Sequence, residues 1–184
     1  MKNDNSNIKK KILIVVSILT IAVLAIASFS GCAKIGTKLV ENAIEKASGG
    51  STDVNLDNGG VTVKDEKGGQ TQIGENVKLP DGWPSDTPLY PDTKPSMSTK
   101  TKNGETGKNE FSVLGEVTKG TIKDVYNWYK GKFGSGWEVV TDQYTESEDG
   151  DIAYLNFKSD KYEVSVMVGA SGENVTLTMT VIEQ

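Results

Sequence analysis

The chain contains no histidine and no arginine, and its only cysteine is Cys32. Without histidine it lacks the commonest general base and metal ligand of proteins. Without arginine it lacks the planar group that binds phosphates and carboxylates through two parallel hydrogen bonds. A single cysteine excludes an intramolecular disulfide and a zinc site built from cysteines. Stability must therefore come from packing alone, and the sequence predicts no cofactor.

One long hydrophobic run stands near the N-terminus. Lys9, Lys10 and Lys11 precede residues 12–29, which contain no charge. At about 1.5 Å per residue these residues form a helix of roughly 27 Å, close to the thickness of the hydrocarbon core of a bilayer. Lysines before such a run stay on the cytoplasmic side, because cations cross hydrocarbon at a high cost in free energy. The segment is therefore predicted to direct export.

The run ends in Phe29, Ser30, Gly31 and Cys32. This segment resembles the lipobox of bacterial lipoprotein signal peptides, an aliphatic residue, two small residues and a cysteine, although Phe29 departs from the usual leucine. The resemblance implies a diacylglyceryl group on the Cys32 thiol and signal cleavage between Gly31 and Cys32. Two acyl chains, at about 0.8 kcal/mol per buried CH₂, anchor a protein stably. The predicted location is the extracytoplasmic face of the cell membrane, with a lipid anchor.

Three other interpretations of this segment stay open. Residues 12–29 are long enough to act as an uncleaved anchor helix. Ala25, Ile26 and Ala27 match the A-x-A pattern of ordinary signal cleavage, which would release the protein. Cys32 could also be a buried small hydrophobic residue, although its place directly after the run argues against this.

The charge of the exported part bears on its partners. Residues 1–31 hold four of the 20 lysines and one of the 25 acidic residues, so cleavage leaves 16 lysines, 24 acidic residues and a net charge of −8. An acidic domain is poorly suited to bind nucleic acid or an anionic lipid surface. We therefore expect membrane attachment through the N-terminal lipid and no nucleic-acid partner. A protein or glycan partner in the cell envelope stays open, and the sequence identifies none.

Changes in composition divide the chain into five segments. Residues 1–31 are the predicted signal peptide, and residues 32–50 a tether with a short amphipathic helix. Residues 51–78 read as a small β-hairpin unit around an Asn-Gly turn. All five prolines fall within residues 79–95, which predicts a stiff strap packed on the domain beneath. Residues 96–184 form the main domain.

The main domain is predicted to be α+β. Its helix, expected over residues 118–133, has apolar residues at helical spacing and a capping box of Thr121 and Asp124. The predicted sheet has about six antiparallel strands, two before the helix and a four-strand meander after it, with the helix on one face. The strands are expected at 96–102, 109–116, 137–144, 151–158, 162–168 and 175–182.

Several short motifs support a second resemblance. They are Leu79–Pro84 (Leu-Pro-Asp-Gly-Trp-Pro), Pro88–Pro91 (Pro-Leu-Tyr-Pro), Tyr129-Lys130 and Gly136-Trp137. Together with the order of the elements they resemble a type of exported bacterial lipoprotein domain, over about the last hundred residues. The resemblance implies export and an α+β fold, but no activity.

Few residues are candidates for chemistry. The acidic run that contains Glu146, Glu148, Asp149 and Asp151 offers oxygen ligands, but it lacks the alternating spacing of a calcium loop, so a solvated turn is the preferred interpretation and no metal site is predicted. Trp128 falls off the apolar stripe of the helix, which makes it the candidate binding residue, although packing is the commoner role of a single tryptophan.

The sequence thus predicts a membrane-anchored, exported lipoprotein with a non-catalytic binding or structural role in the cell envelope. No catalytic residue is assigned, because no usable nucleophile motif occurs outside the signal segment. Two alternatives stay open: a small hydrolase that works through carboxylates, and a carrier of a small hydrophobic ligand in an apolar cavity between helix and sheet.

Overall fold

The structure is a computed structural model that describes residues 52–57, 60–66, 68–148 and 150–184. The predicted signal peptide and tether, with Gly31 and Cys32, lie outside the described residues, as does Asp149. Within the described part of the chain, no helix is long and apolar enough to cross a membrane.

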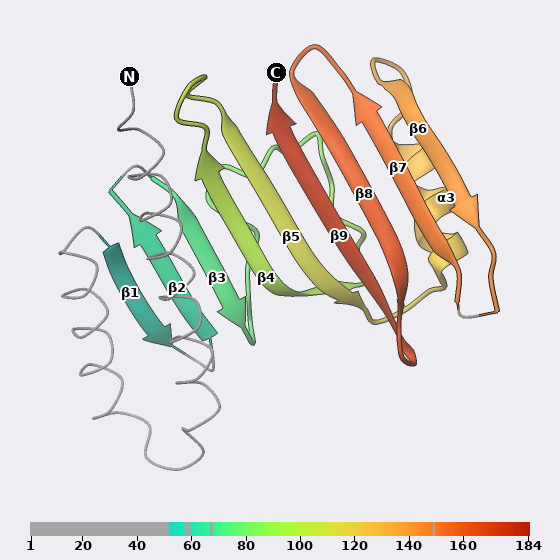
Figure 1. The fold of residues 1–184 in the computed structure, drawn as a ribbon, viewed down its shortest axis with the longest axis horizontal. Helices are drawn as coiled ribbons and strands as arrows, with labels where there is room; N and C mark the ends of the chain where they lie inside the picture. Colours follow the sequence, from blue (N-terminus) through green and yellow to red (C-terminus); the bar gives the residue numbers. More distant parts are fainter. Residues whose placement is uncertain (1–51, 58–59, 67, 149) are drawn as a thin grey trace, which may run out of the picture.

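In the described residues, nine strands form one antiparallel sheet in the order β1-β2-β3-β4-β5-β9-β8-β7-β6 (Figure 1). They are β1 (Thr52–Asp57), β2 (Gly60–Asp65), β3 (Gln70–Gly74), β4 (Thr93–Lys102), β5 (Asn109–Val117), β6 (Glu138–Thr145), β7 (Ile152–Lys158), β8 (Tyr162–Ser171) and β9 (Asn174–Glu183). The helix α3 spans Ile122–Lys132, between β5 and β6.

The predicted α+β fold, a sheet of about six strands plus a small N-terminal β-hairpin unit, is wrong. The described part of the chain is essentially all-β, one continuous sheet with a single helix. The reason lies at the junction of β3 and β4, where Gln72 pairs with Ser98 and Ile73 with Met97. Backbone hydrogen bonds at this junction add the three N-terminal strands to the main sheet, so they form no unit of their own.

Local sequence determines where α3 begins. Thr121 is the N-cap residue, and its hydroxyl accepts from the backbone N–H of Asp124 at 3.2 Å. The Asp124 carboxylate in turn accepts from the Thr121 backbone N–H at 2.8 Å, which completes the predicted capping box. The helix therefore starts at Ile122 instead of residue 118.

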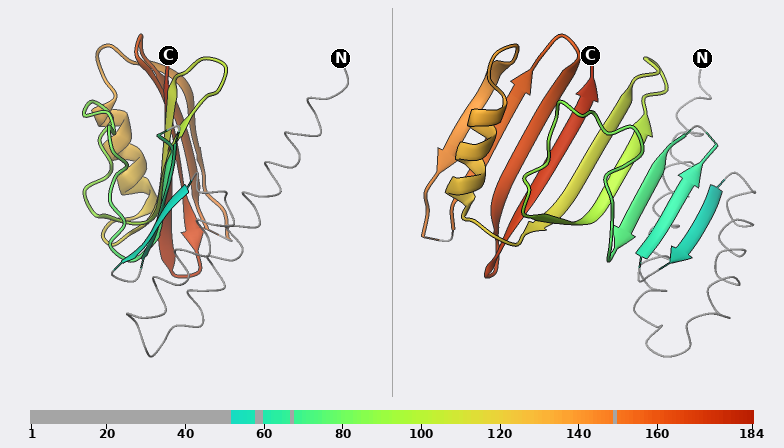
Figure 2. Two further views of the ribbon diagram at one scale, coloured as in Figure 1. Left: turned by 90° about the vertical axis from the view of Figure 1, so that its left-hand side faces the viewer. Right: turned by 180° about the vertical axis from the view of Figure 1, so that it is seen from behind.

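The hydrophobic core lies between the sheet and a layer made of α3 and the strap, which cover the same face (Figure 2). Tyr129 of α3 is fully buried, and its ring stacks on that of Phe133 with centroids 6.0 Å apart. Trp83, Leu89 and Tyr90 of the strap pack against this cluster, as expected for that segment. The sheet contributes mainly β5, β7, β8 and β9: Phe111, Val117, Ala153, Leu155, Phe157, Val164, Val166, Val168, Leu177, Met179 and Val181.

The N-terminal strands present a polar surface on the face that carries the core elsewhere. Thr62, Gln72 and Ser98 are paired in a row across β2, β3 and β4, and Ser98 pairs in turn with the buried Val113 of β5. Directly paired residues share a face of the sheet. The residues next to this row along the same strands are apolar. They are Val61, Ile73 and Met97, and because side chains alternate along a strand they lie on the opposite face of the sheet. The chain around the start of the strap thus crosses polar side chains of the sheet. The candidate site lies between this segment and the strands.

Candidate functional site

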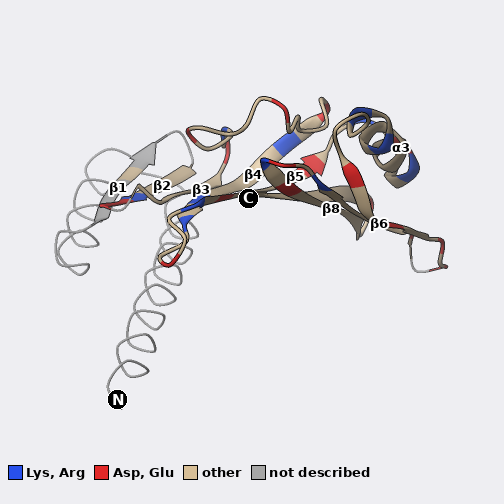
Figure 3. Cartoon of the chain, turned by 90° about the horizontal axis from the view of Figure 1, so that it is seen from above, with Lys and Arg blue, Asp and Glu red and all other residues tan. Residues whose placement is uncertain are grey.

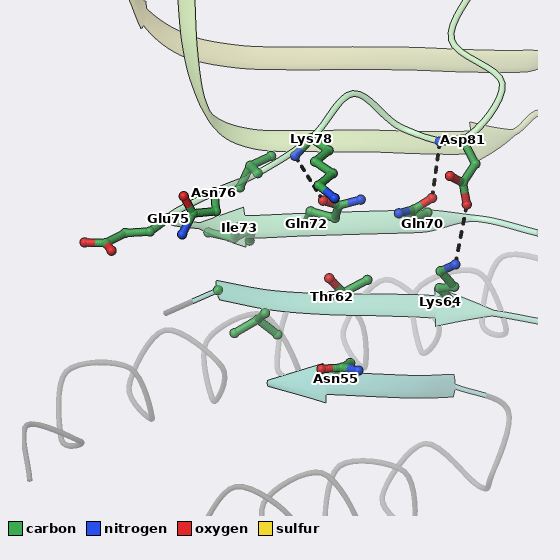
Figure 4. A pocket seen from close by; sticks show the side chains of 13 residues that line it. Asn55, Thr62, Lys64, Gln70, Gln72, Ile73, Glu75, Asn76, Lys78 and Asp81 are labelled. Atoms are coloured by element: carbon green, nitrogen blue, oxygen red, sulfur yellow. Dashed lines mark hydrogen bonds and ion pairs between the residues drawn. The ribbon is translucent and has the colours of Figure 1, made fainter. Parts of the chain in front are cut away.

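A polar groove lies between the strands β1–β3, which form its floor, and residues 75–81, which form its wall (Figure 4). Its volume is about 470 Å³, which falls in the range of about 300–1,000 Å³ typical of ligand sites. The floor carries Asn55, Thr62, Lys64, Gln70 and Gln72, and the wall contributes Glu75, Asn76, Lys78 and Asp81. We take this groove as the candidate functional site.

Backbone N–H groups of the wall hold the two floor glutamines. The side-chain oxygen of Gln72 accepts from the backbone N–H of Lys78 at 3.2 Å, and that of Gln70 accepts from the backbone N–H of Asp81 at 3.5 Å. A backbone N–H can only donate, so the amide oxygens must face the wall. The NH₂ groups then point along the floor, turned toward each other (Figure 4).

Further bonds fix the wall to the sheet. The Ser98 hydroxyl, fully buried, donates to the backbone oxygen of Lys78 at 2.8 Å. Lys100 donates from Nζ to the backbone oxygen of Asp81 at 3.0 Å. Lys64 and Asp81 form an ion pair of 3.5 Å between exposed side chains, and such pairs contribute little to stability. The groove is thus preformed by hydrogen bonds between side chains of the sheet and the backbone of the wall.

A second cluster of ionisable groups lies between α3 and β6, at the other end of the molecule from the groove strands (Figure 3). Lys130 pairs with Asp142 at 2.7 Å, and Tyr126 donates to the same carboxylate. The hydrogen bonds from Lys130 and then Tyr126 lower the pKa of Asp142, while the bond to Asp142 raises the pKa of Lys130. Each group is held in its ordinary charge state, and neither is poised to exchange a proton near neutral pH.

The predicted acidic run is not gathered into a metal site among the described residues. Glu146 pairs with Lys123 at 3.5 Å, and Asp151 accepts from the Tyr144 hydroxyl. The bond to Asp151 raises the pKa of Tyr144 to about 12. Glu148 is exposed. Over the described ranges no group of three or more acidic, cysteine or histidine residues is arranged to hold an ion.

Trp128, the predicted binding candidate, lies in the packing between helix and strap. Its ring meets Tyr90 edge-on at 5.4 Å and Tyr129 at 4.8 Å, and Lys132 Nζ lies 5.3 Å from its centroid. It is half-buried and forms no part of the groove lining.

The sequence alone did not predict a site at the groove residues. The signal that marks them is the alternation of Val61 and Val63 with Thr62 and Lys64, repeated in β3 as Gln70 and Gln72 beside Ile73. Alternation shows that one face is polar, but not which segment crosses it.

Comparison of the chain with protein-family models found no match, and comparison with curated proteins found none either.

Proposed function

We propose that the protein is an envelope lipoprotein anchored through Cys32, and that its sheet domain is a non-catalytic binding module with the polar groove as its ligand site. The observation that carries this proposal is the pair Gln70 and Gln72, whose amide oxygens are fixed by the wall and whose NH₂ groups face the groove. Preformed sites of this kind bind without the entropy cost of ordering side chains.

No observation on the described residues favours the alternative of a hydrolase. The groups with altered pKa values between α3 and β6 keep their ordinary charge, whereas acid–base catalysis needs a pKa near the working pH. The alternative of a hydrophobic-ligand carrier gains no support either. Tyr129, Phe133 and Phe157 fill the space between helix and sheet, and Phe133 and Phe157 lie 4.5 Å apart between ring centroids.

Ligand binding is tested with the protein purified from membranes in detergent, against a panel of envelope saccharides and peptides. The variant Thr62→Trp fills the groove, since Thr62 lies on its floor. Thr178→Trp is the matched control, because Thr178 pairs with Leu114 and Met167 on the opposite face of the sheet. We expect saturable binding of at least one polar compound, lost in Thr62→Trp and retained in Thr178→Trp. Binding by no member, or binding that survives Thr62→Trp, contradicts the proposal.

The anchor is tested by fractionation of cells that produce the wild type or Cys32→Ser. We expect the wild type in the membrane fraction, released by detergent but not by high salt, because acyl chains hold it there. Attachment of Cys32→Ser alone does not separate the two kinds of anchor, because a chain without the thiol can keep residues 12–29 as a helix. The N-terminus of the membrane-bound wild type separates them. A wild-type chain that still carries residues 1–31 contradicts a lipid anchor and favours an uncleaved helix.

A further inference from the structure

We infer that the groove binds an acidic saccharide, and that the Gln70–Gln72 pair receives its carboxylate. The inference rests on the proposed function, since it specifies the ligand of the same groove.

The donors converge on one place. Gln70 and Gln72 are two residues apart on β3, so both side chains lie on the same face. Each amide keeps two N–H donors after its oxygen is taken by the wall. The NH₂ groups face each other along the floor (Figure 4). A ligand group that bridges them must accept from both sides, which a carboxylate with its two oxygens does.

Two lysines and two carboxylates line the groove, so its charges balance. Lys64 is engaged with Asp81, Glu75 is exposed, and Lys78 provides a second cation beside the glutamines for an anionic ligand. The hydroxyl of Thr62 and the amide of Asn55 continue the floor toward the β1 edge. They provide further partners for hydroxyl groups of the kind that flank a carboxylate in a uronic acid.

The lining also argues against other acidic ligands. Of its apolar members, Val61 and Ile73 direct their side chains to the opposite face of the sheet, which leaves Val77, and the described lining contains no aromatic residue. An acidic peptide would bring apolar or bulky side chains that find no pocket here, and an acyl chain would lie on polar groups without partners. A saccharide, polar over most of its surface, fits this floor.

The test is a calorimetric titration of the protein purified from membranes in detergent. The probes are cellotriose and cellotriuronate, which share one backbone and differ in a CH₂OH or a carboxylate at C6. The variant Gln72→Glu keeps the oxygen that accepts from Lys78 but replaces the NH₂ donors with a negative charge. Gln143→Glu makes the same change on the exposed side chain of a β6 residue and is the control.

We expect cellotriuronate to bind at least tenfold more tightly than cellotriose, and Gln72→Glu to weaken that binding at least tenfold. Gln143→Glu should change the affinity less than twofold. If Gln72→Glu fails to fold by circular dichroism, Thr62→Val replaces it, with a loss of at least threefold expected.

A third probe, triglutamate, is an acidic peptide. Four results overturn the inference: no binding of cellotriuronate, equal affinity for cellotriose and cellotriuronate, unchanged affinity in the groove variants, or binding of triglutamate as tight as that of cellotriuronate. Equal affinity that is lost in Thr62→Trp leaves the groove as a binding site and removes only its preference for acid. Equally tight binding of triglutamate overturns the choice of a saccharide.

Discussion

The hydroxyl of Tyr129 accepts a hydrogen bond from the backbone N–H of Tyr90 at 3.0 Å, and so joins α3 to the strap. The same hydroxyl donates to the sulfur of Met179 in β9 at 3.5 Å. One buried atom thus connects the helix, the strap and the sheet, and burial raises the pKa of Tyr129 well above its usual range. The hydroxyl therefore stays protonated at neutral pH.

Removal of this hydroxyl should destabilise the fold. Tyr129→Phe leaves the Tyr90 N–H without its partner, at a cost of about 1–3 kcal/mol in the free energy of unfolding. Urea denaturation followed by tryptophan fluorescence measures the change. Tyr154→Phe is the control, because Tyr154 is 37% exposed and surface changes stay within about 0.5 kcal/mol. Equal stability of the two variants would show that the bond between helix and strap is unimportant.

The contact of β5 with the bulge in β4 should tolerate no side chain at Gly115. A Cβ there would lie 2.8 Å from the backbone oxygen of Lys94 and 3.0 Å from Cα of Pro95. Gly115→Ala should therefore lower the free energy of unfolding by about 1–3 kcal/mol.

Gly169→Ala offers a matched comparison in β8. No atom lies within 4 Å of its added Cβ, so this variant should be neutral or more stable by up to about 1 kcal/mol. Thermal unfolding of the two variants measures the difference, and Gly115→Ala should melt at the lower temperature. Equal melting temperatures would contradict the predicted clash at Gly115.

Stability should depend on pH through Glu183. Its carboxylate accepts from the backbone N–H of Asn109 at 2.8 Å and from the side-chain amide at 3.0 Å. These bonds lower its pKa in the folded state, the backbone bond most of all. A lowered folded pKa stabilises the protein above the unfolded value of about 4.5, and this stabilisation is lost as the pH falls further.

Melting temperatures measured from about pH 7 down to about pH 3 test this dependence. The wild type should exceed Glu183→Gln at neutral pH, and the difference should shrink below about pH 4.5. Asn109→Ala removes the side-chain donor to Glu183. When both proteins carry Asn109→Ala, the effect of Glu183→Gln on the melting temperature at neutral pH should therefore be smaller. A constant difference over the whole range would rule out titration of Glu183 as its cause.

Local features of this fold could be predicted from the sequence, whereas the pairing of distant strands could not. Thr121 and Asp124 lie three residues apart, so their capping box depends on nothing beyond the first turn of α3. The strands after the helix were predicted to within three residues, because tight turns and alternation define them. The pairing of β3 with β4 is made by backbone hydrogen bonds, and every strand edge presents the same backbone groups. The residue types of the two strands therefore do not predict that they pair.

Pro95 illustrates the same limit. A proline has no backbone N–H to donate within a strand. The sequence therefore predicted that the strap extends to residue 95. In the structure Pro95 lies within β4, where the register against β5 shifts between Pro95 and Met97. A bulge accommodates the missing donor. The polar groove was missed for a related reason, because the roles of Gln70 and Gln72 depend on the wall that crosses them.

The central claim is that Cys32 carries the lipid that holds the domain at the membrane. The most direct test is the intact mass of the protein extracted from the membrane fraction, with fragmentation of its N-terminal peptide. The account predicts a chain that begins at Cys32, heavier than the bare polypeptide by a diacylglyceryl group on sulfur. A chain that still carries residues 1–31, or one with an unmodified Cys32, would contradict it.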